Sequence, residues 1–322
     1  MATEMNLATE QYKRNISKKT GITKTLSHLN KFKWLYILML PGLLYFIIFK
    51  YIPMFGLIII FENYHPALGF LGSKWVGLKH FIRFFTEPDF TLLLKNTLLI
   101  STLNIIFYFP LPILLALLLN EVTSTSVKRI VQTVTYLPHF FSWVVIASLS
   151  YIFLTTEGGI INELLVRFGG EKINFLMEPK FFRPLIVLQQ IWKDVGWGTI
   201  IYLSAICSIE VEMYEAARID GASRFQQLRF ITLPSITGTI VVLLVLRLGQ
   251  ILNTGFEQIF LQLSPTTREV GDVFDTFVYE IGLTGGQFSY ASAVGFFKSF
   301  VGLLLVYTAD KISKKLGQDG VF

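Results

Sequence analysis

The sequence contains few residues of the types that make or break covalent bonds. It has one cysteine, Cys207, and four histidines, and none of them stands at a metal-ligand spacing such as HExxH or CxxC. The G-x-x-x-x-G-K-[ST] loop that cradles nucleotide phosphates is also absent from it. Because no nucleophile–base pair or metal constellation occurs, the sequence predicts no catalytic residue, no metal site and no cofactor bound by this chain.

Charged side chains inside long apolar blocks are the residues best suited to act on a solute. Six ionisable residues lie in such blocks: Lys50, Lys193, Asp194, Arg247, Glu257 and Lys298. A charge within lipid costs about 2–3 kcal/mol or more, so such residues usually face a bundle interior or an aqueous cavity. They indicate either a polar translocation path or two structural pairs, Lys193 with Asp194 and Arg247 with Glu257.

Aromatic residues close to these charges could bind a sugar, whose C–H faces stack on aromatic rings. Trp143, Trp192, Trp197 and Tyr202 fall in the same blocks. Aromatic residues also gather at membrane interfaces without any ligand, so both interpretations stay open. The translocation path, if present, is expected to include the following residues: Trp143, Lys193, Asp194, Trp197, Asn253 and Glu257.

The apolar blocks themselves indicate the fold class. Of the 322 residues, 52% are apolar and 16% are charged, against about 25% charged in ordinary soluble domains. The blocks lack the period-two alternation of membrane β-barrels, so we expect an all-α membrane protein. Six blocks are long enough to span a bilayer as helices of about 20 residues: Trp34–Phe61, Leu92–Leu119, Ile130–Phe153, Leu185–Ile209, Ile236–Phe260 and Tyr290–Tyr307.

The distribution of basic residues predicts the orientation of these six transmembrane helices. If residue 1 is cytoplasmic, fifteen basic residues lie in the inner segments and nine lie in or beside the outer ones. The positive-inside rule then places both termini in the cytoplasm, which also explains the net charge of +6 without nucleic acid. No short apolar stretch with a cleavage site precedes the first block, so we expect no cleaved signal peptide. The predicted divisions are a basic segment at 1–33, a transmembrane domain at 34–308 and a cytoplasmic tail at 309–322.

The segment between the fourth and fifth blocks, residues 210–235, is the most informative part of the chain. Its centre reads EAARIDGASRFQQLRFITLP from Glu215 to Pro234. Two short helical stretches, 214–219 and 223–230, are separated by Asp220-Gly221, a pair suited to a turn or to a residue at positive φ. Such a helix–turn–helix could present a rigid knob to another protein, or it could be an ordinary amphipathic loop.

The same segment resembles the EAA loop of permease subunits in binding-protein-dependent ABC importers. Glu215-Ala216-Ala217, then Gly221, then nine residues, then Ile231 and Leu233-Pro234 match every fixed position of that pattern. Less specific stretches at 40–53, 75–81, 132–145, 191–205 and 252–260 are similar to the branch that imports oligosaccharides and polysaccharide fragments.

The resemblance implies a mechanism and a set of partners. Residues 215–227 would dock into a cytoplasmic ATPase subunit as a coupling helix, with Gly221 allowing the turn, Ala216 and Ala217 allowing close approach, and Glu215 and Asp220 capping or pairing. The implied partners are a second homologous permease, two ATPase subunits that bind ATP and Mg, and an extracellular or periplasmic solute-binding protein. The chain would then be a non-enzymatic, multi-pass subunit in a bacterial cell membrane that imports a carbohydrate, most plausibly an oligosaccharide.

Two alternatives remain at this stage. The same kind of importer could carry another polar solute. An ion-coupled secondary transporter would instead use the charges within the blocks as proton or cation sites and would work without an ATPase.

Overall fold

The computed structural model describes residues 32–315 and 317 in two units, residues 1–58 and 59–322. The basic segment expected at 1–33 lies outside the described residues except for Phe32 and Lys33, as does most of the tail beyond Lys315. The first unit contains one apolar helical rod, composed of α3 (Lys33–Phe46), η1 (Ile47–Tyr51), α4 (Ile52–Met54) and the start of η2 (Phe55–Phe61). This rod coincides with the first predicted block.

Prolines follow three of the four π-helical turns among the described residues. Three π-helical turns, η1, η3 (Asn104–Tyr108) and η5 (Leu228–Thr232), each end two residues before a proline: Pro53, Pro110 and Pro234. Proline lacks an N–H and its ring collides with the carbonyl group four residues earlier. A single wide turn at that point relieves the collision while the chain continues as a helix.

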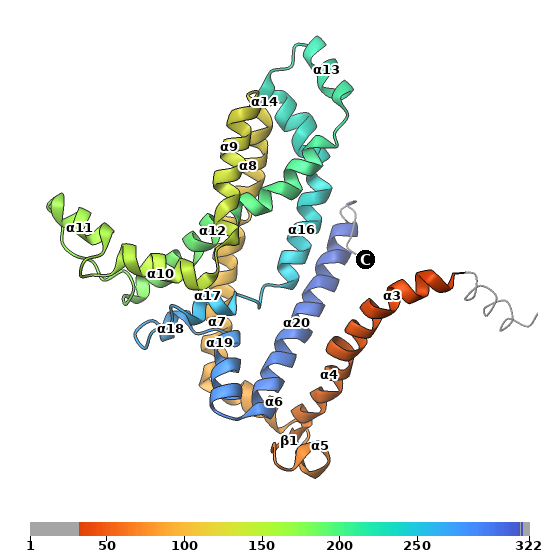
Figure 1. The fold of residues 1–322 in the computed structure, drawn as a ribbon, viewed down its shortest axis with the longest axis vertical. Helices are drawn as coiled ribbons and strands as arrows, with labels where there is room; N and C mark the ends of the chain where they lie inside the picture. Colours follow the sequence, from red (N-terminus) through yellow and green to blue (C-terminus); the bar gives the residue numbers. More distant parts are fainter. Residues whose placement is uncertain (1–31, 316, 318–322) are drawn as a thin grey trace, which may run out of the picture. The chain divides into compact units, whose positions relative to one another are not determined.

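The second unit begins with a small layer of short elements. Strands β1 (Glu62–Asn63) and β2 (Lys74–Trp75) pair antiparallel, with Glu62 opposite Trp75. The short helix α5 (Gly69–Gly72) joins them, and α6 (Lys79–Thr86) follows. In Figure 1 this layer lies at one end of the unit, and helices α13 and α14 lie at the other end.

The rest of the second unit is helical. Its elements in chain order are α7 (Pro88–Leu103), η3, α8 (Pro110–Glu121), α9 (Thr125–Tyr136), η4 (Leu137–Phe140), α10 (Trp143–Leu154), α11 (Ile160–Arg167), α12 (Pro179–Cys207), α13 (Val211–Ile219), α14 (Arg224–Gln227), η5, α15 (Leu233–Ser235), α16 (Thr237–Gly249), α17 (Phe256–Phe260), α18 (Arg268–Gly271), α19 (Phe274–Tyr279), η6 (Glu280–Thr284) and α20 (Phe288–Lys315).

Helix α12 is the central element of this unit and packs against both α8 and α9. Two glycines make these crossings close. A Cβ atom at Gly196 would collide with the backbone carbonyl of Thr135 on α9, and one at Gly198 would press on the Pro112 ring of α8. Buried apolar side chains on α8 and α12, including Leu119 and Tyr202, fill the space between them.

The six predicted blocks match the structure in part. Three helical stretches are long and apolar enough to cross a membrane by themselves: Lys33–Phe61, Pro88–Glu121 and Phe288–Lys315. Three bent pairs reach that standard only together, at Thr125–Phe140 with Trp143–Leu154, Pro179–Cys207 with Val211–Ile219, and Arg224–Ser235 with Thr237–Gly249. The described residues therefore hold three to six spans, and the number six stays a prediction.

Several block boundaries differ from the prediction. The third block is bent by 101° between η4, which ends at Phe140, and α10, whose start is capped by Ser142. The fifth is interrupted after Gly249, and the positive φ of Gly255 precedes α17. The sixth continues to Lys315, so the boundary predicted at 308 falls inside α20.

Candidate functional site

The coupling loop, which we define as residues 210–235, has the two-part form that its sequence predicted. Helix α13 ends at Ile219, and Gly221 follows with φ +77°. The backbone N–H of Gly221 donates to the Arg218 carbonyl at 3.0 Å, and that of Ala222 donates to the Ala217 carbonyl at 2.8 Å. These bonds satisfy carbonyl groups at the helix end, and only glycine adopts the required φ without strain.

The second half of the coupling loop begins with a capping box. The Ser223 N–H donates to the Gln226 side-chain oxygen at 2.7 Å, and the Gln226 N–H donates to the Ser223 hydroxyl at 3.3 Å. The Ser-x-x-Gln pattern is visible in the sequence, although our sequence analysis did not use it. It fixes the start of α14 and therefore the angle between the two parts of the loop.

Side-chain contacts hold the coupling loop together and join it to the helical bundle. The Tyr214 hydroxyl connects the two halves of the loop, since it lies 2.9 Å from the hydroxyl of Thr232, which is buried. Arg224 lies 3.7 Å from Glu121 at the end of α8. The outer face of the loop carries apolar side chains that are strongly exposed, with Ile219 at 86% and Phe225 at 71%. The loop is thus held in place by side-chain contacts and exposes apolar side chains on its outer face.

Glu215 and Asp220 were expected to cap or pair. Neither side chain has a hydrogen bond or ion pair with any described residue, so pairing with a partner subunit stays a prediction. Their exposed positions leave both carboxylates in contact with solvent. Ala216 and Ala217 lie on α13 as expected, and Ile231, Leu233 and Pro234 form the helical continuation into the bundle.

A second group of polar residues gathers near the middle of the bundle. Lys193 is 8% exposed, and its ammonium group donates to the backbone carbonyls of His139, at 2.7 Å, and Phe141. The same ammonium group lies 5.3 Å from the centre of the Trp143 ring. The lysine is therefore directed at the break between η4 and α10.

The neighbouring residues on α12 hold the His139 side chain. One carboxylate oxygen of Asp194 lies 2.7 Å from His139 Nδ1, and Gln190 donates to the other Asp194 oxygen. The His139 ring stacks on Trp197 with 4.3 Å between ring centres and 4° between planes. Trp197 remains 47% exposed, so its far face is open. We call His139, Lys193, Asp194 and Trp197 the mid-helix cluster.

Arg247 on α16 extends the mid-helix cluster on one side. Its guanidinium group lies 5.8 Å from the centre of the Tyr108 ring, and the Tyr108 hydroxyl lies 3.5 Å from the Asp194 carbonyl. No carboxylate among the described residues pairs with Arg247. Tyr108 and His139 could not be predicted as members of this site, because their partners are 86 and 55 residues away along the chain.

The structure also corrects the two structural pairs considered from the sequence. Lys193 and Asp194 each bind His139 and its neighbours instead of each other. Arg247 and Glu257 form no ion pair within the described part of the chain. Asn253 and Glu257 are exposed, and no described contact joins them to the mid-helix cluster.

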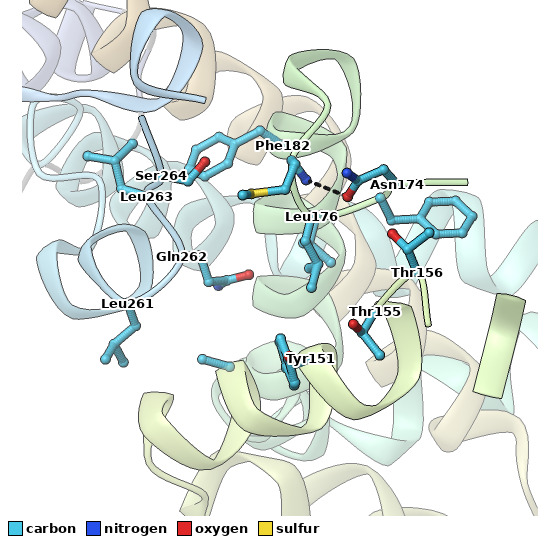
Figure 2. A pocket seen from close by; sticks show the side chains of 14 residues that line it. Tyr151, Thr155, Thr156, Asn174, Leu176, Phe182, Leu261, Gln262, Leu263 and Ser264 are labelled. Carbon is cyan, nitrogen blue, oxygen red and sulfur yellow. Dashed lines mark hydrogen bonds between the residues drawn. The ribbon is translucent and has the colours of Figure 1, made fainter. Parts of the chain in front are cut away.

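A cavity of about 410 Å³ opens between α10, the start of α12 and the segment after α17. Figure 2 shows Tyr151, Leu176 and Gln262 around it. The Gln262 amide donates to the Gln189 side chain of α12 at 2.7 Å, and Gln189 donates to Ser150 of α10 at 2.7 Å. These hydrogen bonds therefore join α10, α12 and the turn after α17 beside the cavity.

Two titratable side chains of the short-element layer, Glu87 and His80, have shifted pKa values and hydrogen-bond partners. Burial by itself would raise the pKa of Glu87, but hydrogen bonds from Tyr290, at 2.5 Å, and Arg83, at 2.7 Å, lower the pKa below its usual value. Burial lowers the pKa of His80, whose Nε2 lies 3.0 Å from the Glu62 carbonyl. These groups hold α6, α7 and α20 together rather than face a cavity.

Comparison with known proteins identifies the class of this chain. Residues 108–317 match the family described as binding-protein-dependent transport system inner membrane component, and this range contains both the coupling loop and the mid-helix cluster. The chain belongs to this family. The resemblance of residues 215–234 to the EAA loop is thereby confirmed as membership of a permease family.

Individual relatives cover nearly the whole permease. It is 56% identical over 307 residues to the polygalacturonan/rhamnogalacturonan transport system permease protein YteP of Bacillus subtilis, with 95% of this chain and 96% of that protein covered. A crystal structure of a bacterial ABC transporter involved in the import of the acidic polysaccharide alginate matches with a TM-score of 0.84 and 42% identity, over 91% of this chain and 99% of that one. A second structure, of the bacterial alginate ABC transporter in complex with an alginate pentasaccharide-bound periplasmic protein, matches with a TM-score of 0.85 and 42% identity, over 92% and 99% of the two chains.

Proposed function

We propose that this permease forms half of the membrane channel of an ATP-driven importer for oligosaccharides that carry carboxylate groups. The main support is the similarity over almost the full chain to a permease named for polygalacturonan and rhamnogalacturonan and to a transporter of the acidic polysaccharide alginate. The unpaired guanidinium group of Arg247 and the exposed ring of Trp197 have the chemistry such a substrate needs, since guanidinium binds carboxylate and aromatic faces stack on sugar rings.

The proposed topology has six spans, with each bent helix pair counted as one. Both termini and the coupling loop then lie in the cytoplasm, in accord with the basic residues of the inner segments. The membrane is the bacterial cell membrane. The proposed assembly contains this chain, a second homologous permease, two ATPase subunits that bind ATP and Mg, and an extracellular or periplasmic solute-binding protein.

The coupling loop is proposed to convert ATP binding into movement. The exposed side chains of Ile219 and Phe225 form an apolar tip that fits a cleft of an ATPase subunit. The turn at Gly221 and the capping box at Ser223 keep the two parts of the loop rigid. When two ATPase subunits close around ATP, the loop follows them, and the spans change from inward-facing to outward-facing access.

The translocation path is proposed to pass the exposed side of the mid-helix cluster. Arg247 lies ten residues into α16, which is about 15 Å along this helix from Thr237. Trp197, Asp194, Trp143 and Arg247 would line the path there, with Lys193 behind them. Asn253 and Glu257, both exposed, would contact the solute farther out.

Uptake by the complete importer in proteoliposomes tests this function. We expect ATP-dependent uptake of an oligogalacturonide to exceed that of a neutral oligosaccharide of equal length. Arg247→Gln should reduce uptake of the acidic sugar about tenfold, because one charge-assisted bidentate contact is lost, and should leave the neutral sugar nearly unchanged. Arg247→Lys is the matched variant that keeps the charge. Equal uptake of both sugars by the wild-type importer would contradict the acidic substrate.

A further inference from the structure

The break in the third predicted span leaves backbone groups without helical partners. Helix α9 and η4 end at Phe140, α10 begins at Trp143, and the two parts are bent by 101°. The Ser142 hydroxyl accepts from the Val145 N–H at 3.3 Å and so caps the second part. The carbonyl groups before the break need another donor, because an unsatisfied carbonyl in a bilayer is strongly unfavourable.

Lys193 supplies that donor from a different helix. Its buried ammonium group binds the carbonyls of His139 and Phe141, one on each side of Phe140. A continuous helix would use these carbonyls for its own N–H groups four residues later. The lysine therefore stabilises the bent form of this segment over the straight one.

Neighbouring residues on the same face of α12 hold the rest of the break. Gln190, Lys193, Asp194 and Trp197 are spaced at i, i+3, i+4 and i+7, which places them on one stripe of the helix. Asp194 binds the His139 ring, and Trp197 stacks on it. The glycine at 196 brings the backbone of α9 within direct contact of α12 at the same level.

Helix α12 also leads directly to the coupling loop. It is unbroken from Pro179 to Cys207, and α13 begins four residues later at Val211. A displacement of the loop therefore moves the helix that carries Lys193. The far side of the break, α10, lines the cavity shown in Figure 2 through Ala147 and Tyr151.

We propose that Lys193 is a positioning residue that fastens the bend of the 125–154 segment to α12, so that movement of the coupling loop changes the angle between α9 and α10. This inference rests on the proposed function for its role in transport, but the fastening itself is independent of any substrate. Lys193 then binds the backbone carbonyls at the break and does not bind the solute directly.

The first test measures the bend in the assembled importer. Spin labels at Val134→Cys and Ile152→Cys, two exposed positions on either side of the break, report the α9–α10 distance in a Cys207→Ser background. We expect a narrow distribution in the parent protein that shifts on trapping with ATP and vanadate. Lys193→Met should broaden the distribution and abolish the shift, and Lys193→Arg should restore it in part.

The second test measures transport and ATP hydrolysis in the same samples. Lys193→Met should lower uptake about tenfold, because the two carbonyls lose their donor, while ATP hydrolysis stays within about twofold. The matched control is the double variant Lys298→Met with Asp275→Asn, which removes another, half-buried lysine and its partner from the bundle and should leave the distance and the uptake per ATP unchanged.

The outcomes separate the inference from the function on which it rests. An unchanged, narrow distance distribution in Lys193→Met would overturn the inference, whatever the uptake. A parallel loss of hydrolysis and uptake at an unchanged distance would also overturn it, since that result indicates a merely structural lysine. If the wild-type importer shows no ATP-driven uptake, the proposed function fails, while the distance measurement still decides whether Lys193 holds the bend.

Discussion

Gly221 is the residue on which the shape of the coupling loop depends most directly. Glycine adopts the φ of +77° at this position without strain, and its N–H donates to the Arg218 carbonyl. Proline at this position would fix φ near −65° and remove the donor, so the turn could not form. We therefore expect Gly221→Pro to permit membrane insertion and to reduce ATP-driven uptake about tenfold or more, because the knob no longer fits the ATPase.

A glycine elsewhere provides the control for this substitution. Gly169 follows α11 with φ +81°, donates to the Val166 carbonyl and also has open space around it. Gly169→Pro damages the backbone in the same way, far along the chain from the coupling loop, and should leave most uptake intact. Normal uptake by Gly221→Pro would show that the loop does not transmit the movement.

Residues differ in how far the sequence could predict them. Gly221 was predictable, because an Asp-Gly pair between two helical stretches indicates a local turn. The role of Lys193 was not, because its carbonyl partners are 54 and 52 residues away and depend on the packing of α9 on α12. The pairs expected from the sequence failed for the same reason, since residue spacing says nothing about which helices meet.

At the scale of elements, the packing of α12 against α9 is the contact that positions the mid-helix cluster. A Cβ atom at Gly196 would meet the Thr135 carbonyl, which is backbone and cannot rotate away. Gly196→Ala should therefore separate the helices and lower the free energy of unfolding by about 1–3 kcal/mol. Thermal unfolding of the chain purified in detergent measures this change.

Gly295 on α20 is the matched control for helix packing. An added Cβ atom there finds no atom within 4 Å, so α20 makes no close crossing at this position among the described residues. Gly295→Ala should be neutral or stabilise by up to about 1 kcal/mol, because alanine has the higher helix propensity. Equal destabilisation by both substitutions would contradict the assigned α9–α12 contact.

Helical content and the approximate place of each apolar block followed from the sequence, because long apolar runs in a bilayer have no alternative to helix. Breaks within the blocks did not follow, because they depend on tertiary partners. The bend after Phe140 needs the Lys193 ammonium group, and the turn after Gly249 occurs where α16 crosses α20 beside Gly302. Prolines marked places of irregularity without specifying whether the helix would widen or break.

At the scale of the whole molecule, several observations fit our proposal that the chain works as one subunit of a larger importer. It belongs to a family of transport-system membrane components, and its sequence holds no P-loop for ATP. Its coupling loop ends in exposed apolar side chains, and Arg247 in the bundle lacks a carboxylate partner among the described residues. Both features are explained if ATPase subunits cover the loop and an anionic sugar passes the arginine.

The proposed assembly is tested most directly by purifying the tagged chain from its native host in mild detergent. Mass spectrometry then identifies the proteins that co-purify with it. We expect a second six-span permease and an ATPase to co-purify with the wild-type chain, and the ATPase to be lost with Gly221→Pro. A chain that purifies alone, and that still moves solute into vesicles without ATP, would contradict the account and favour an ion-coupled transporter.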